Sequence, residues 1–280
     1  MQIQWYPGHM ARAKRLLKEQ LSRVDVVLEL CDARLPASSR NPDLDALCGH
    51  KRRLVVLGKA DLAEEAVTRA WVRRFERKGL EAMPFVASRG RPKGILAGIE
   101  RAVADTVERQ AARGIRKTVR AMVLGVPNVG KSTLINCLRG QAVAKTADRP
   151  GVTRANQWVR VTPYLELLDT PGLLWPKLED PQAALRMAYV GTIRNEVVAQ
   201  EELAQSLLEE LLALRESAPA ERFRLTPPYG EGQALLENAC RGRGWLMAGG
   251  LPDTERGAAL VLDEFRAGRL GRLTLERPGE

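Results

Sequence analysis

The segment Gly125–Ser132, with the sequence GVPNVGKS, limits the possible folds of this 280-residue chain more than any other. It follows an apolar run at Ala121–Leu124 and precedes apolar residues at helical spacing, Leu134, Ile135 and Leu138. Glycines allow successive backbone N–H groups to converge on phosphate oxygens where a helix begins. The segment therefore predicts a strand, a phosphate-binding loop and a helix in an α/β fold, with a simple glycine-rich turn as the alternative.

Further apolar runs, mostly rich in β-branched residues, indicate buried strands on both sides of this loop. They are Val24–Leu30, Leu54–Leu57, Met83–Val86, Trp158–Val161 and Leu165–Leu168. Between the third and fourth strands, Ile95, Ile99, Val103 and Val107 recur at helical spacing and predict a crossover helix with a basic exit at Arg113–Arg120. The fold class is therefore α/β, a mostly parallel sheet flanked by helices.

Strand patterns end after about Pro176, and helical patterns take their place. Leu203, Leu207, Leu208, Leu211 and Leu214 form an apolar stripe, and two short helical patterns follow near Leu235 and Leu260. We expect a first domain at residues 1–177, with an N-terminal extension of about residues 1–22, and a small all-α domain at residues 178–280.

The composition indicates a polyanionic partner. The formal net charge is +10 and the pI is about 9.8, and cationic surfaces gain free energy from counterion release on nucleic acid. An arginine-rich proteome is the other explanation. No uncharged apolar run reaches about 18 residues, and the start of the chain lacks the apolar stretch of a secretory signal. We therefore expect a cytoplasmic protein without a membrane partner, whose widely spaced cysteines stay reduced.

Two motifs carry chemistry beside the loop. Lys131 is expected to bridge the β- and γ-phosphates, and Ser132 to ligate magnesium. Downstream, Asp169-Thr-Pro-Gly172 has the DxxG form, in which the carboxylate holds a magnesium-bound water and the glycine N–H senses the γ-phosphate. By itself this sequence is more often an ordinary turn. Between the two motifs, Thr153 can ligate magnesium as a switch residue.

Base selection requires another motif, and the candidate lies upstream of the phosphate-binding loop. Leu54–Leu57 leads into Gly58-Lys-Ala-Asp61, which is close to the NKxD box whose aspartate accepts hydrogen bonds from guanine. After the next strand, Ala87-Ser-Arg89 can close over the base through backbone groups. A solvated charged turn is the alternative for Lys59 and Asp61.

The order guanine box, base loop, phosphate-binding loop, switch threonine and DxxG resembles that of circularly permuted GTPases. The chain is most similar to the ribosome biogenesis GTPase A (YlqF/RbgA) family, and the likeness spans nearly its whole length. The matching segments are Trp5–Met10, Asp32-Ala-Arg34, Ser39–Pro42, Pro127–Ser132, Asp169–Lys177 and Phe265–Arg272.

This resemblance implies a GTPase that acts in late assembly of the large (50S) ribosomal subunit and is stimulated by that particle. It implies binding of GTP or GDP, Mg²⁺ and K⁺, with contacts to rRNA and ribosomal proteins. The nucleotide-binding residues would be Lys59, Ala60, Asp61, Ala87, Ser88, Arg89, Asn128, Val129, Gly130, Lys131, Ser132, Thr133 and Gly172. Ser132, Thr153 and Asp169 would hold Mg²⁺, and Asn128 would hold K⁺.

Two positions depart from the family. Gly58 stands where an asparagine usually supports the base and braces the phosphate-binding loop, so we expect weaker nucleotide binding. The base loop has Ala87-Ser88 where Ser-Ala would be usual.

Catalysis also needs a group that orients water. Leu173 follows the DxxG motif and cannot do so. His9 is the best candidate, because a neutral imidazole has a suitable pKa range and the resemblance suggests the same residue. The expected catalytic set is His9, Lys131, Thr153 and Gly172. A structural His9 remains the alternative, and His50 is expected to be structural.

Three functions remain open at this point. The first is an RNA-particle assembly GTPase, expected to be a monomer. The others are a P-loop ATPase or nucleotide kinase, because the loop itself does not select the base, and a scaffold that binds nucleotide without hydrolysing it. The expected RNA surface is basic, although a solvated helical face is the alternative. It comprises Arg241, Arg243, Arg256, Arg266, Arg269 and Arg272.

Overall fold

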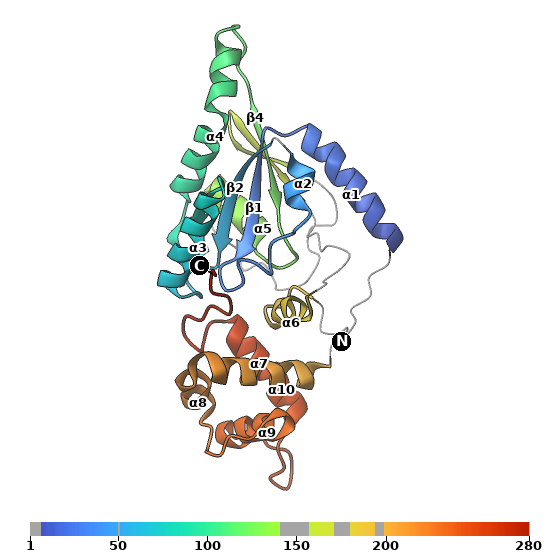
Figure 1. Ribbon diagram of the computed structural model, residues 1–280, viewed down its shortest axis with the longest axis vertical. Helices are drawn as coiled ribbons and strands as arrows, with labels where there is room; N and C mark the ends of the chain where they lie inside the picture. Colours follow the sequence, from blue (N-terminus) through green and yellow to red (C-terminus); the bar gives the residue numbers. More distant parts are fainter. Residues whose placement is uncertain (1–6, 50, 141–156, 171–179, 194–198, 280) are drawn as a thin grey trace. The chain divides into compact units, whose positions relative to one another are not determined.

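A computed structural model describes residues 7–49, 51–140, 157–170, 180–193 and 199–279, with side chains from Arg15 onward (Figure 1). The chain forms two compact units. Unit 1 comprises Met1–Glu179 and Glu276–Glu280, and unit 2 comprises Asp180–Leu275. The last residues thus differ from the domain ranges expected from the sequence, because they pack with the first unit.

Unit 1 is built on a six-stranded sheet with the order β3-β2-β1-β4-β6-β5. All pairs are parallel except β5 with β6, which is antiparallel. The strands are β1 (Val26–Asp32), β2 (Arg52–Gly58), β3 (Glu81–Pro84), β4 (Val119–Leu124), β5 (Gln157–Thr162) and β6 (Leu165–Asp169). The predicted α/β class and each predicted strand are confirmed, with boundary shifts of a few residues.

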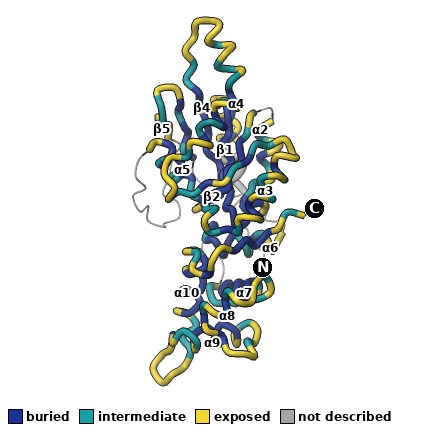
Figure 2. Tube along the Cα trace, turned by 90° about the vertical axis from the view of Figure 1, so that its left-hand side faces the viewer, coloured by how far each residue is buried: buried dark blue, intermediate teal, exposed yellow. Residues whose placement is uncertain are grey.

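Helices cover both faces of this sheet. They are α1 (Pro7–Ser22), α2 (Leu44–Cys48), α3 (Glu65–Arg77), α4 (Lys93–Ala111) and α5 (Lys131–Arg139). Leu17 and Leu21 of α1 pack with Val27 of β1 and Met122 of β4. The predicted crossover helix is α4, whose Gly98 lies against Leu54 on the opposite face. The strand interiors are buried, whereas the α4–β4 connection is exposed (Figure 2).

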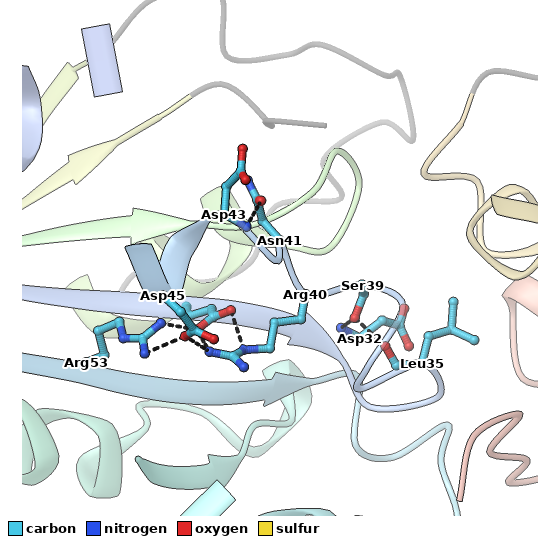
Figure 3. A network of polar contacts seen from close by, with 9 residues as sticks. Asp32, Leu35, Ser39, Arg40, Asn41, Asp43, Asp45 and Arg53 are labelled. Carbon is cyan, nitrogen blue, oxygen red and sulfur yellow. Dashed lines mark hydrogen bonds and ion pairs between the residues drawn. The ribbon is translucent and has the colours of Figure 1, made fainter. Parts of the chain in front are cut away.

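The segment after β1, residues 33–43, is fixed by buried polar contacts (Figure 3). Ser39 Oγ accepts a hydrogen bond from Asp32 N at 2.9 Å and donates to Leu35 O at 2.5 Å. Arg40 pairs with the buried Glu29 carboxylate and with Asp45, both at 2.8 Å. Burial raises the pKa of the Glu29 carboxyl, against the opposing charges of its arginine partners. These contacts hold the segment at the carboxyl end of β1.

The C-terminal residues of unit 1 bind to the same segment. The Glu276 carboxylate accepts hydrogen bonds from Ala37 N at 2.7 Å and from Ser38 N at 3.1 Å, and also from Ser38 Oγ. The carbonyl of Glu276 accepts from Trp71 Nε1 of α3 at 2.9 Å. Because Glu276 is 7% exposed, this carboxylate is a buried anchor for the end of the chain.

Unit 2 is helical in the residues that the structure describes. Its helices are α6 (Pro181–Tyr189), α7 (Gln200–Arg215), α8 (Ser217–Phe223), α9 (Gly232–Arg243) and α10 (Thr254–Arg266). The stripe predicted on α7 forms the core, and Leu203, Leu207 and Leu211 are fully buried. Among the described residues, no helix combines the length and apolar character needed to cross a membrane.

Candidate nucleotide site

The loop between β4 and α5 has a backbone that only certain residues can adopt. A Cβ on Gly125 would lie 2.5 Å from Leu30 O of β1, so the loop can pack this closely only with glycine. Gly130 has φ of 103°, in the left-handed region, and immediately precedes α5. Asn128 has φ of 59°, a conformation that asparagine tolerates better than most residues. This geometry opens the start of α5 toward the loop, as an anion site requires.

Lys131 lies inside this loop. Its Nζ donates hydrogen bonds to Val126 O at 2.9 Å and to Gly125 O at 3.2 Å, and the residue is 7% exposed. Burial lowers the pKa of the Lys131 amine to about 8, and the nearby Asp169 charge opposes that shift. The amine is thus positively charged at neutral pH in a buried position, where its field on a phosphate is weakly screened by solvent.

Ser132 and Asp169 meet across the loop from different elements. Ser132 Oγ in α5 donates to Asp169 Oδ2 at the end of β6 at 3.2 Å. The next residue, Thr170, anchors this end of β6, because its Oγ1 donates to Val123 O of β4 at 2.7 Å. A hydroxyl and a carboxylate are hard oxygen ligands, and their proximity fits the Mg²⁺ expected beside a phosphate-binding loop.

Lys59 of the guanine box reaches the phosphate-binding loop. It has φ of 54°, and its Nζ donates to Asn128 O at 3.0 Å. The same nitrogen lies 3.3 Å from Asp32 Oδ2 at the end of β1. Lys59 therefore connects the loops that follow β1, β2 and β4 and braces the phosphate-binding loop from the side of the guanine box.

Asp32 holds Lys59 through a buried charge cluster. Arg34 binds the Asp32 carboxylate through Nε at 3.0 Å and through a terminal nitrogen at 2.8 Å, and each residue is 1% exposed. Burial by itself would raise the pKa of the Asp32 carboxyl. The charges of Arg34 and Lys59 and the Arg34 hydrogen bonds instead hold that pKa well below its usual range. The carboxylate is therefore a fixed negative charge under Lys59.

The base-selecting segments lie at the same edge of the sheet. Asp61 is exposed beyond β2, and Ala60 N donates to Phe85 O at 3.2 Å, which joins the loops after β2 and β3. Ala87–Arg89 forms a short 3₁₀ helix, and Ala87 O accepts from Cys137 Sγ of α5 at 3.7 Å. The guanine box and base loop thus adjoin the phosphate-binding loop, as their order in the sequence predicts.

The structure leaves part of the predicted catalytic set untested. Thr153, Gly172 and Leu173 lie outside the described residues. His9 belongs to the first turn of α1, but its side chain is also outside them. Within the loop and the start of α5, Val129 is buried and Thr133 is partly buried, next to the residues described above.

Sequence reasoning missed Asp32 and Arg34 as members of the site. They were used only as part of a family resemblance, because an Asp-Ala-Arg tripeptide carries no specific chemistry on its own. Their position after the first predicted strand was the available signal, since ligands of open parallel sheets bind beyond the carboxyl ends of the strands.

The arginines expected to bind RNA in unit 2 fall into two groups. Arg266 donates to Tyr189 O at 2.8 Å and to Ala188 O at 3.0 Å, so it caps the end of α6. Arg243 pairs with Glu264 at 3.4 Å and lies over the Trp245 ring. The remaining four are exposed: Arg241, Arg256, Arg269 and Arg272. A structural role for Arg266 and Arg243 makes this second group the better candidate for an RNA surface.

Comparisons with known proteins agree with this geometry. The sequence profile described as 50S ribosome-binding GTPase matches residues 120–218, which include the phosphate-binding loop and the DxxG motif. A relative from Bacillus cereus, ribosome biogenesis GTPase A, is 45% identical over 282 residues, 100% of this chain and 95% of its own length. The mouse protein mitochondrial ribosome-associated GTPase 1 is 33% identical, with coverage of 98% and 90%.

Solved structures are similar over the same extent. The GDP-bound structure of YlqF has a TM-score of 0.69 at 27% identity and covers 95% of this chain and 100% of that chain. The GNP-bound YlqF from T. maritima has a TM-score of 0.67 at the same identity, with coverage of 96% and 99%. The likeness therefore includes the helical unit as well as the phosphate-binding loop.

Proposed function

This chain belongs to the ribosome biogenesis GTPase A family, and on that basis we propose that it is a GTP-hydrolysing factor for late assembly of the large ribosomal subunit. The observation that carries the proposal is the meeting of Lys59, Lys131 and the Ser132–Asp169 pair at one edge of the sheet. Membership of a GTPase family also decides against the ATPase and nucleotide-kinase interpretations, which the loop alone left open.

GTP and GDP are the proposed ligands of this edge. The relatives of known structure are GDP-bound and GNP-bound, which supports the assignment. Asp61 would accept hydrogen bonds from guanine, and Ala87–Arg89 would close over the base beside Ala60. Backbone N–H groups from Asn128 to Thr133, together with Lys131, would hold the phosphates. Gly172 would sense the γ-phosphate.

Ser132, Thr153 and Asp169 would hold Mg²⁺, and Asn128 would contribute to a K⁺ site. When bound, these cations supply positive charge that offsets the charge developing on the transferred phosphoryl group. The chain itself orients the phosphates. Lys131 presents its amine from within the loop, and Lys59 keeps the loop backbone in place through Asn128 O.

The proposed partner is the large ribosomal subunit, through rRNA and ribosomal proteins, with the protein acting as a monomer in the cytoplasm. The exposed arginines of unit 2 support RNA binding. Unit 2 follows the DxxG segment directly in the chain, so ordering of that segment by the γ-phosphate would be felt at its start. Nucleotide state would in this way alter how the helical unit meets RNA.

The main test combines turnover with co-sedimentation. Purified large subunits are expected to accelerate GTP hydrolysis over multiple turnovers, and a non-hydrolysable GTP analogue is expected to retain the protein on the subunits. ATP should support neither effect. Nucleotide binding without turnover in the presence of subunits would instead indicate a scaffold that does not hydrolyse GTP.

His9 is proposed to orient the attacking water, because Leu173 cannot. Its role would then exist only in the transition state, so His9→Ala should lower subunit-stimulated turnover by roughly 10²-fold at unchanged GTP affinity. Leu173→Ala is the control and should do much less. If His9 only packs the N-terminal segment, turnover will fall in step with subunit binding, and single-turnover rates on saturated complexes will match those of wild type.

A further inference from the structure

The connection between α4 and β4 carries cations that the proposed function does not use. The chain leaves α4 at Ala111, turns through Gly114 and begins β4 at Val119. Arg113 and Arg116 are exposed on this turn, and neither forms an ion pair within the described part of the chain. They project at the end of the sheet where β4 begins (Figures 1 and 2).

Exposed aromatic side chains lie beside these cations. Val119 N donates to Tyr164 O at 2.8 Å, which fixes the β5–β6 turn next to the start of β4. Tyr164 is 60% exposed, and its own N donates to Thr162 Oγ1 at 3.2 Å within the turn. The position of this ring is thus set by backbone pairing, although the ring itself faces solvent.

A stacked cation and ring extend the surface across the strands. The Arg120 guanidinium lies 5.2 Å from the centre of the Trp158 ring, and Trp158 is 37% exposed. Arg120 also contacts Glu166 at 3.4 Å, and Lys117 binds Asp25 at 2.9 Å. The neighbouring carboxylates are therefore occupied by Arg120 and Lys117, whereas Arg113 and Arg116 keep their charge available to a partner.

We call these five residues, Arg113, Arg116, Arg120, Trp158 and Tyr164, the β4 amino-end surface. The phosphate-binding loop follows the opposite end of the same strand. With six residues in β4 and about 3.3 Å per residue, the two ends are roughly 20 Å apart. A partner on the β4 amino-end surface would therefore leave the nucleotide site accessible.

We propose that the β4 amino-end surface binds RNA. Arg113 and Arg116 contact phosphates, and unpaired bases stack on Trp158 and Tyr164. Exposed aromatic rings beside guanidinium groups suit single-stranded or looped RNA, because every base offers a face for stacking and the backbone offers charge. A protein partner would need carboxylates to match the cations and gives no reason for two exposed rings. The inference rests on the proposed binding to the large ribosomal subunit.

The test uses the full chain and a charge-matched control. Arg113→Glu with Arg116→Glu is compared with Arg73→Glu and Arg77→Glu, which change exposed residues of α3 by the same charge. Affinity for purified large subunits is measured across a range of salt concentrations. The first variant should lower the slope of log affinity against log salt by roughly 1.4 to 1.8, for two lost phosphate contacts. The control should retain the wild-type slope.

The aromatic residues are tested separately. Trp158→Leu and Tyr164→Leu should each weaken binding by about fivefold or more while leaving the salt slope unchanged, because stacking releases no counterions. GTP affinity should equal that of wild type in every variant. Equal slopes for the cation variant and its control would overturn the RNA surface.

A second probe separates RNA from protein. The same variants are measured on protein-free rRNA extracted from large subunits, where the defects should persist. Defects on subunits that vanish on extracted rRNA would assign the surface to a ribosomal protein and overturn this inference alone. If wild type itself fails to bind subunits at any salt concentration, the proposed function fails as well.

Discussion

The two ends of the parallel strands in unit 1 use positive charge in opposite ways. At the carboxyl ends, Arg34 and Lys131 are buried, and Lys59 is held between Asp32 and Asn128 O. At the amino ends, Arg113 and Arg116 are exposed. The first group bears a desolvation cost that is offset by fixed acceptors, whereas the second group remains hydrated.

This difference separates shape from attraction. Buried cations with fixed partners hold a loop in the geometry that a phosphate needs, and salt screens them only weakly. Exposed cations give range and rate to the association with a large anion, and salt screens them strongly. The contacts at the carboxyl ends should therefore decide nucleotide binding, and those at the amino ends should affect only the particle. The three predictions below test the carboxyl end.

The largest effect is expected from Asp32→Asn. The substitution leaves the buried Arg34 guanidinium without its carboxylate, and such changes cost about 3–5 kcal/mol of unfolding free energy. Asp105→Asn is the control, because its contact with Arg52 lies at the surface, with the Asp105 side chain 77% exposed, and should be worth less than about 1 kcal/mol. Chemical denaturation measures both variants. Similar small losses for the two would mean that the cluster is not a stabilising element.

Asp32 also predicts the sign of a pH effect. Its pKa is lowered in the folded protein, so its stabilising contribution is present above the unfolded pKa of about 3.9 and is lost as pH falls below it. Wild-type unfolding free energy should therefore drop more steeply between about pH 5 and pH 3 than that of Asp32→Asn. Parallel pH profiles would contradict the charge assignment.

An intermediate effect is expected from Asp61→Asn. Two hydrogen bonds from guanine to a carboxylate would be lost and their geometry reversed, so preference should shift from GTP toward xanthosine triphosphate by about 10²-fold. Competition binding with both nucleotides measures the shift, and fold stability should be unchanged because Asp61 is exposed. An unaltered preference would remove Asp61 from base selection.

The smallest effect is expected from Gly58→Asn. A Cβ at this position would lie 3.5 Å from Val129 O and 3.1 Å from Leu30 Cδ1, so the new side chain points at the phosphate-binding loop and requires a small shift of Leu30. One added hydrogen bond should tighten GTP binding by roughly threefold to tenfold. Gly58→Ala, which adds the methyl group without the amide, should give no gain. Equal affinity of the two variants would mean that Lys59 already braces the loop fully.

Much of the fold could be predicted because its signals are local. Each strand of unit 1 is a short apolar run, and Gly125 and Gly130 mark the loop where side chains would clash or strain the backbone. The motif order was equally visible, since permutation changes the order of segments in the chain and leaves each segment intact. The role of Glu276 was not visible, because it depends on contacts with Ala37 and Ser38 more than 230 residues away.

The sequence by itself determined the class of fold, the phosphate-binding loop, the permuted order and the family. Those features depend on residue type and spacing within a few turns or strands. Only the tertiary structure decided which charges are buried together: Asp32 under Lys59, Arg266 on the end of α6, and Arg120 over Trp158. An arginine or aspartate has the same letter whether it is solvated or buried, and its energetic role is set by the partners that folding brings to it.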